Sequence, residues 1–160
     1  MSFESERLEF DHFQAFAEWV NSGALIQNVT FMKPEYRFGN SRFDFYLEAE
    51  GKRILVEVKG VTLEDQGVVR FPDAPTERGV KHLRELVSCQ EAGYGAYIVF
   101  IIQMKDVSYF EPNEETHPEF AEALRDAGRA GVHVLAVDCC VTENSISAAD
   151  LVEVLIDRER

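Results

Sequence analysis

The stretch SRFDFYLEAEGKRILVEVKG, residues 41–60, decides the fold of the chain. Two runs of alternating apolar and polar residues flank Glu50-Gly51. Glycine at the second position of a two-residue turn accepts the positive φ that a tight hairpin needs. If these two residues form the turn, the register that follows places Asp44 opposite Glu57. The sequence therefore predicts a β-hairpin with two carboxylates directly across from each other.

The alternation of the two strands also assigns each side chain to a face of the sheet. Asp44, Glu57 and Lys59 fall on one face of the predicted hairpin. The apolar residues assigned to the other face are Phe43, Phe45, Ile54, Val56 and Val58. Because its neighbours in sequence are strongly apolar, the strand that carries Glu57 is expected to be central in the sheet, where a carboxylate needs a partner.

The two opposed carboxylates predict a cation site. Directly opposed residues lie about 5 Å apart at Cβ, and carboxylates at that distance repel unless a positive charge lies between them. Hard cations such as Mg2+ take oxygen ligands, so Asp44 and Glu57 are candidate ligands, and Lys59 could hold a water, a leaving group or a phosphate beside the metal. An exposed polar face without chemical function is the alternative for so short a motif.

This spacing of residue types has a known chemical use. An aspartate followed, on the next strand, by Glu-x-Lys is the arrangement of the PD-(D/E)XK nucleases, here Asp44, Glu57 and Lys59. In such a site a metal ion polarises the phosphate and acidifies a bound water. The motif therefore predicts metal-assisted hydrolysis of a phosphodiester.

The composition limits what such a site could act on. The 160 residues fit one domain, and 46% of them are hydrophobic. The net charge of −13 argues against a broad basic surface for nucleic acid, because phosphate binding depends on Lys and Arg. It leaves room for a local basic groove. Three cysteines without a metal-binding spacing predict reduced thiols in a cytoplasmic protein, and no apolar run reaches membrane-spanning length.

Apolar periodicity predicts the elements around the hairpin. A helix is expected from Asp11 to about Gly23, and the first strand from Glu35 to Phe38, because Pro34 breaks any helix. The further elements expected are a helix after Thr76 ending near Gly93, a strand at 96–102, a helix from Pro118 to about Ala130 and a strand at 132–137. Residues 145–160 fit either a strand at 151–156 or a helix from Ser147.

Together these elements predict an α/β fold with a mixed central β-sheet of about five strands and helices on both faces. The order strand, helix, strand indicates parallel pairing of the later strands. We expect a single domain over residues 1–160, with a helical lead-in at 1–34, the nuclease-like core at 35–140 and a C-terminal element at 141–160.

The helix after Thr76 carries a second candidate group. Thr76 is a good N-cap, and Arg78, Lys81 and His82 share one face of the predicted helix. Such a face is unusual in so acidic a chain, and it could bind a phosphate beside the Glu-x-Lys strand. An ordinary solvated helix face explains the same pattern equally well.

Three segments resemble the sugar fermentation stimulation protein A family: SRFDFYLE, ILVEVKGVTL and FPDAPTERGVKHLREL. The last is the most specific, and the resemblance covers about residues 35–140. It implies a PD-(D/E)XK restriction-endonuclease-like core, binding of Mg2+ or Mn2+, and association with DNA in the regulation of sugar use. It makes Asp44, Glu57 and Lys59 the nuclease core, and it matches Glu35 to a preceding acidic metal contact.

The same resemblance adds further expectations. It implies the main-chain carbonyl of Val58 as a metal ligand, and it matches a helix motif to Thr76, Glu77, Arg78, Lys81 and His82. Members of the family carry an N-terminal β-barrel of the OB type, a fold that binds nucleic acid. The present sequence predicts a helix before residue 35 in place of that barrel.

The sequence leaves more than one function open. A Mg2+- or Mn2+-dependent nuclease acting on DNA or RNA is favoured because all three residue types of the motif are present. A DNA-binding or regulatory module that does not cut is the alternative, favoured by the acidic charge, and a domain for protein contacts is a third. DNA is the expected partner rather than RNA, with weak binding by the chain alone and no membrane association. A homodimer is left open.

Overall fold

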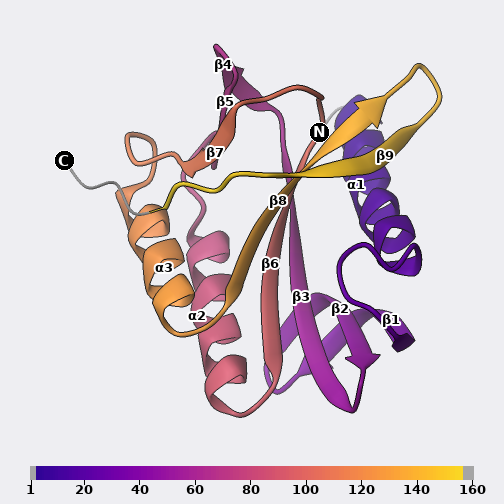
Figure 1. Cartoon of the computed structure of the whole chain (residues 1–160). Coiled ribbons are helices and arrows are strands. Elements are labelled where there is room, and N and C mark those ends of the chain that lie inside the picture. The colour runs from indigo at the N-terminus through magenta and orange to yellow at the C-terminus, as the bar shows by residue number, and fades with distance from the viewer. Residues whose placement is uncertain (1–2, 157–160) are drawn as a thin grey trace.

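The computed structural model describes residues 3–156, and their side chains from residue 12 onward. It contains a six-stranded mixed sheet in the order β1-β2-β3-β6-β8-β9 (Figure 1). Its strands are β1 (Val29–Phe38), β2 (Ser41–Ala49), β3 (Lys52–Val61), β6 (Gly95–Ile102), β8 (His133–Val141) and β9 (Ile146–Val152). The helices are α1 (Phe3–Asn21), α2 (Glu77–Glu91) and α3 (Pro118–Arg129). A small second sheet contains β4 (Leu63–Asp65), β5 (Val68–Phe71) and β7 (Tyr109–Pro112).

The main sheet is antiparallel at both sides and parallel in the middle. β1, β2 and β3 pair antiparallel, β3, β6 and β8 pair parallel, and β9 pairs antiparallel with β8. The helices α2 and α3 connect the parallel strands (Figure 1). Parallel strands covered on both faces are apolar throughout, as the buried run of β6 is. The predicted α/β fold with a mixed, helix-flanked sheet is confirmed.

Helices cover both faces of the sheet, so the protein has two hydrophobic cores. Phe16 and Trp19 of α1 pack with Leu47 and Val56 on one face. Leu83 of α2 and residues of α3 pack on the opposite face. The strand β3 lies between these two cores, which makes it central, as its apolar sequence predicted.

The hairpin has the predicted register. Glu50 and Gly51 have φ values of 52° and 77°, and two positive values are the mark of the turn that matches the twist of a two-residue hairpin. Phe45 pairs with Val56 in the resulting ladder. A slip of one residue would move every side chain of β3 to the opposite face, so this turn is what keeps Glu57 on the same side as Asp44.

The alternation of β2 fails at Asp44. Phe45 packs in the core beneath α1, but Phe43 packs in the other core, so its predicted face was wrong. Glu35, which lies across from this position on β1, has a φ of 54°. A residue with left-handed backbone conformation inside a strand bends the strand and locally reorients the side chains. The alternation of apolar and polar residues in the sequence cannot reveal such a bend.

Several predicted boundaries also differ. β1 begins at Val29, so residues 29–34 belong to the sheet and not to a helical lead-in. Pro34 is tolerated because β1 is an edge strand, where a missing N–H costs no ladder bond. α1 begins at Phe3 rather than Asp11. The C-terminal element contains the strand β9 rather than a helix from Ser147.

Candidate active site

Asp44 lies where β2 and β3 separate. The ladder between the two strands ends at Phe45 and Val56. Beyond that pair, the main-chain N–H of Val58 donates a hydrogen bond to Oδ2 of Asp44 at 2.7 Å. The carboxylate therefore takes the place of the next ladder bond, and its position beside Glu57 is fixed by the backbone of β3.

Glu57 is 2% exposed and lies between two basic side chains. Its Oε2 is 3.2 Å from Nζ of Lys59 and 2.5 Å from Nδ1 of His82. Nζ of Lys59 is also 3.3 Å from Nδ1 of His82. The other carboxylate oxygen, Oε1, is buried and forms no hydrogen bond with the residues that the structure describes. One oxygen of this carboxylate thus has two basic partners, and the other has no hydrogen bond within the described chain.

The two carboxyl groups have opposite pKa shifts. Burial, together with the charge of Glu57, raises the pKa of Asp44 from 3.8 to about 7, although the N–H of Val58 and the charge of Lys59 oppose the rise. Burial also acts to raise the pKa of Glu57, but the hydrogen bonds and charges of His82 and Lys59 outweigh it and hold this pKa below its ordinary value. The pair is therefore short of positive charge when both groups are ionised.

A divalent cation fits this pair. It would give Oε1 of Glu57 a partner and would favour the ionised form of Asp44. Within residues 12–156 no three side chains of His, Cys, Asp or Glu converge to hold a metal ion. The side chains would therefore supply two ligands and water would complete the coordination, as is usual for Mg2+.

The predicted site residues are not all brought together. Asp44, Glu57, Lys59 and His82 meet, whereas Glu35 is exposed on β1 and joins no cluster of carboxylates in the described part of the chain. The N–H of Val58 is engaged by Asp44, and the role of its carbonyl as a metal ligand stays a prediction.

The helix residues divide between two surfaces. Oγ1 of Thr76 accepts a hydrogen bond from the N–H of Gly79 at 3.0 Å, which confirms the N-cap. His82 is buried against Glu57, while Arg78, one turn earlier, is exposed. Lys81 and Glu77 line a different hollow, together with Glu119 of α3. Phosphate binding by Arg78 and Lys81 stays a prediction, and the contact of His82 with Glu57 is one that helix periodicity alone could not reveal.

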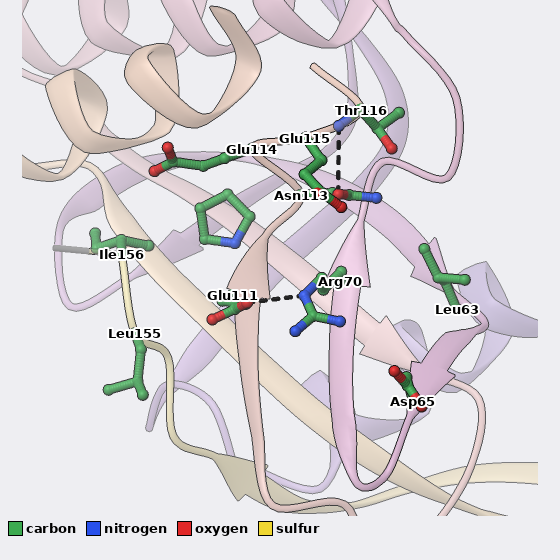
Figure 2. A pocket seen from close by; sticks show the side chains of 11 residues that line it. Leu63, Asp65, Arg70, Glu111, Asn113, Glu114, Glu115, Thr116, Leu155 and Ile156 are labelled. Carbon is green, nitrogen blue, oxygen red and sulfur yellow. Dashed lines mark hydrogen bonds and ion pairs between the residues drawn. The ribbon is translucent and has the colours of Figure 1, made fainter. Parts of the chain in front are cut away.

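A hollow of about 610 Å³ lies away from these residues, between the small sheet and the segments 113–116 and 155–156 (Figure 2). Nε of Arg70 is 2.8 Å from Oε2 of Glu111 at its wall. Local sequence patterns do not reveal this pair, because its members are brought together only by the parallel pairing of β5 with β7.

Comparisons with known proteins agree on one family. The model of the sugar fermentation stimulation protein RE domain matches residues 12–145. The chain is 58% identical over 139 residues to a sugar fermentation stimulation protein homolog of Clostridium beijerinckii, covering 87% of this chain and 62% of that one. It is 60% identical over 141 residues to a homolog of Desulfitobacterium hafniense, covering 88% and 61%.

A solved structure agrees with these matches. SfsA of Pyrococcus furiosus, determined in complex with Ca2+, superposes with a TM-score of 0.83 at 31% identity. The match covers 89% of this chain and 63% of that one. The chain thus spans about three fifths of the length of these relatives. Among the described helices, none combines the length and apolar character needed to cross a membrane.

Proposed function

The chain belongs to the sugar fermentation stimulation protein family, and on this premise we propose that it is a divalent-metal-dependent nuclease that hydrolyses phosphodiester bonds of DNA or RNA. The observation that carries the proposal is the buried Oε1 of Glu57. This oxygen has no hydrogen bond to any described residue, and Asp44 lies beside it with a raised pKa. Buried polar groups without partners are rare and need a reason. A bound cation supplies that reason.

Asp44 and Glu57 would hold Mg2+ or Mn2+. That a relative of the same fold binds Ca2+ supports the choice of a hard divalent ion. A bound divalent ion would polarise the phosphate and acidify a bound water. His82 holds Oε2 of Glu57, so Oε1 would be the oxygen available to ligate a cation.

Lys59 has two candidate roles. Its ammonium group lies 3.2 Å from Oε2 of Glu57, so it could serve only to balance the carboxylates. It could instead bind the phosphate oxygens and stabilise the negative charge that develops on them during hydrolysis. We favour the second role, because a bound metal already neutralises the two acids.

A nucleic-acid-binding module without catalytic activity is the alternative, and the net charge of −13 favours it. The charge is unevenly distributed, however. Residues 33–84, which include the site, carry ten Lys and Arg against nine Asp and Glu, whereas residues 85–160 carry five against fifteen. The segment that contains the site is therefore close to neutral, which allows a polyanion to approach it.

The test is cleavage of single- and double-stranded DNA and RNA by the purified protein in Mn2+, with chelator and the Asp44→Asn variant as controls. We expect cleavage that requires metal and is absent from Asp44→Asn. Equal cleavage by Asp44→Asn would indicate a contaminating nuclease. A protein that binds Mn2+ and nucleic acid but cuts none of the four substrates would support the module without activity.

A further inference from the structure

A pocket of about 490 Å³ lies where the strands β3, β6 and β8 begin, at the lower end of the sheet in Figure 1. Its lining includes the cationic side chains Lys52 and Arg53 and the rings of Tyr94, Tyr97 and His133, but no aspartate or glutamate. This is unusual in a chain with 29 acidic and 16 basic residues. The pocket therefore presents a concentration of positive charge to the solvent.

The two cations of this pocket are not neutralised within the described chain. Lys52 and Arg53 are exposed and form no salt bridge there. Glu48, the cross-strand neighbour of Arg53, accepts a hydrogen bond from the hydroxyl of Tyr46 at 2.6 Å. Glu50 accepts one from Asn28 at 3.0 Å. Both nearby carboxylates thus accept hydrogen bonds from other residues, and neither forms an ion pair with Lys52 or Arg53 within the described chain.

The aromatic rings of the pocket are held in fixed planes. The guanidinium group of Arg53 lies over the ring of Tyr94, 4.4 Å from its centroid. The rings of Tyr97 and His133 stack with their centroids 4.4 Å apart and an angle of 18° between them. His133 is exposed, and a Cβ atom added at Gly93, which also lines the pocket, would meet no atom within 4 Å other than those of its chain neighbours, so there is open space at that point of the lining. Rings next to uncompensated cations are what single-stranded nucleic acid requires of a binding surface.

We propose that this pocket binds a base and an adjoining phosphate of single-stranded nucleic acid. The inference rests on the proposed function, which it extends to the class of substrate. Arg53 and Glu57 are four residues apart on β3, about 13 Å along an extended strand. The pocket and the candidate cleavage site thus lie on the same strand, on either side of the buried Leu55.

The test measures binding of labelled oligothymidylate to the whole chain in Ca2+ over a range of salt concentrations. Lys52→Gln/Arg53→Gln removes the cations that hold the one proposed phosphate, so we expect the slope of log K against log salt to fall by about 0.7. His133→Ala should weaken binding about tenfold, the scale of losing one base stack. The matched control is Arg84→Gln/Arg129→Gln, which removes two exposed cations outside the pocket and should leave the slope unchanged.

A structural readout accompanies the affinities. The chain has four histidines, and we expect the imidazole NMR signals of His133 to move when oligothymidylate is added while those of the buried His117 do not. Wild-type affinity and slope in Lys52→Gln/Arg53→Gln would overturn the inference. So would an equal loss of slope in the control, which would show an effect of net charge alone. AMP binding as tightly as the oligonucleotide and competing with it would also overturn it, because the ligand would then be a free nucleotide.

The outcomes separate this inference from the proposed function. Cleavage by the wild type, with unchanged binding in the pocket variants, would refute the pocket and leave the nuclease standing. Binding that depends on the pocket, with no cleavage of any substrate in Mn2+, would refute the nuclease and leave the pocket standing.

Discussion

The site around Glu57 and the wall of the hollow around Glu111 both place a buried glutamate beside a cation. Glu57 is 2% exposed and Glu111 is 7% exposed. Lys59 lies 3.2 Å from the first, and Arg70 lies 2.8 Å from the second. The difference is that Oε1 of Glu57 has no hydrogen-bond partner in the described chain and that a second carboxylate lies next to it.

The two regions also differ in how their polar groups are paired. The hollow beside Arg70 and Glu111 has a volume of about 610 Å³, and its Asn113 side chain is tied to the carbonyl of Pro72 and the N–H of Thr116 (Figure 2). Satisfied polar groups of this kind stabilise a fold. An unsatisfied buried charge destabilises it, and is retained where a ligand neutralises it.

The largest expected effect is on the rate of cleavage, and it distinguishes the cation beside Glu57, Lys59, from the cation beside Glu111, Arg70. We expect Lys59→Ala to reduce cleavage by at least about a hundredfold, the usual scale for one group that stabilises developing charge. Folding and Mn2+ binding should stay close to those of the wild type. Arg70→Ala should cleave at the wild-type rate. Cleavage by Lys59→Ala at the wild-type rate would show that Lys59 matters no more for cleavage than Arg70 does.

A second comparison uses the pH dependence of stability without metal. The raised pKa of Asp44 means that the stability it contributes is complete below its ordinary pKa of 3.8 and is lost as the pH rises through about 7. The lowered pKa of Glu57 has the opposite sign, and its contribution is lost only as the pH falls below 4.5.

We therefore expect the free energy of unfolding in urea to fall by roughly 2 kcal/mol between about pH 5.5 and about pH 7.5. Asp44→Asn or saturating Mn2+ should abolish this slope, and Glu111→Gln should keep it. A metal-free wild type whose stability is constant over this range would show that the pKa of Asp44 is not raised in the folded protein.

A third comparison concerns two of the buried histidines, His82 and His117. His82 holds Oε2 of Glu57, whereas Nδ1 of His117 accepts the N–H of Thr76 at 3.1 Å. Groups that orient a metal ligand typically affect metal affinity by about 10–100-fold, so His82→Ala should weaken Mn2+ binding at least about tenfold. His82→Asn should restore part of it, and His117→Asn should leave it unchanged. Equal Mn2+ affinity in His82→Ala and the wild type would refute the positioning role.

The smallest effect is expected at the hollow. Glu111→Gln should lower the free energy of unfolding by about 1 kcal/mol, because the ion pair with Arg70 becomes a hydrogen bond from the guanidinium group to an uncharged amide. Urea denaturation measures this change. Cleavage should be unaffected, and a loss of activity in Glu111→Gln would show that the hollow belongs to the active site.

Local patterns explain which parts of the protein the sequence predicted. The register of the hairpin follows from one turn, Glu50-Gly51, and it holds as far as the pair of Phe45 and Val56, where the ladder ends just before Asp44. The buried strand β6 follows from its unbroken apolar run. Each of these features depends on residues that are close in sequence.

The features that escaped prediction depend on tertiary packing. The contact between His82 and Glu57 requires α2 to lie on one face of β3 at a particular rotation, and helix periodicity alone grouped His82 with Lys81 and Arg78. The sequence predicted that β1 would begin after Pro34, because a proline is expected to end regular structure. Only the order of the strands shows that β1 is an edge strand, where a proline is tolerated. The pair Arg70 and Glu111 depends on the pairing of strands 41 residues apart.

The central claim is that Asp44 and Glu57 together bind a divalent cation, and calorimetric titration with Mn2+ tests it most directly. The wild type and Glu111→Gln should bind Mn2+ with the same affinity. Asp44→Asn, folded by circular dichroism, should bind it at least about a hundredfold more weakly, since it loses one of two carboxylate ligands. Undiminished Mn2+ affinity in Asp44→Asn would contradict the claim.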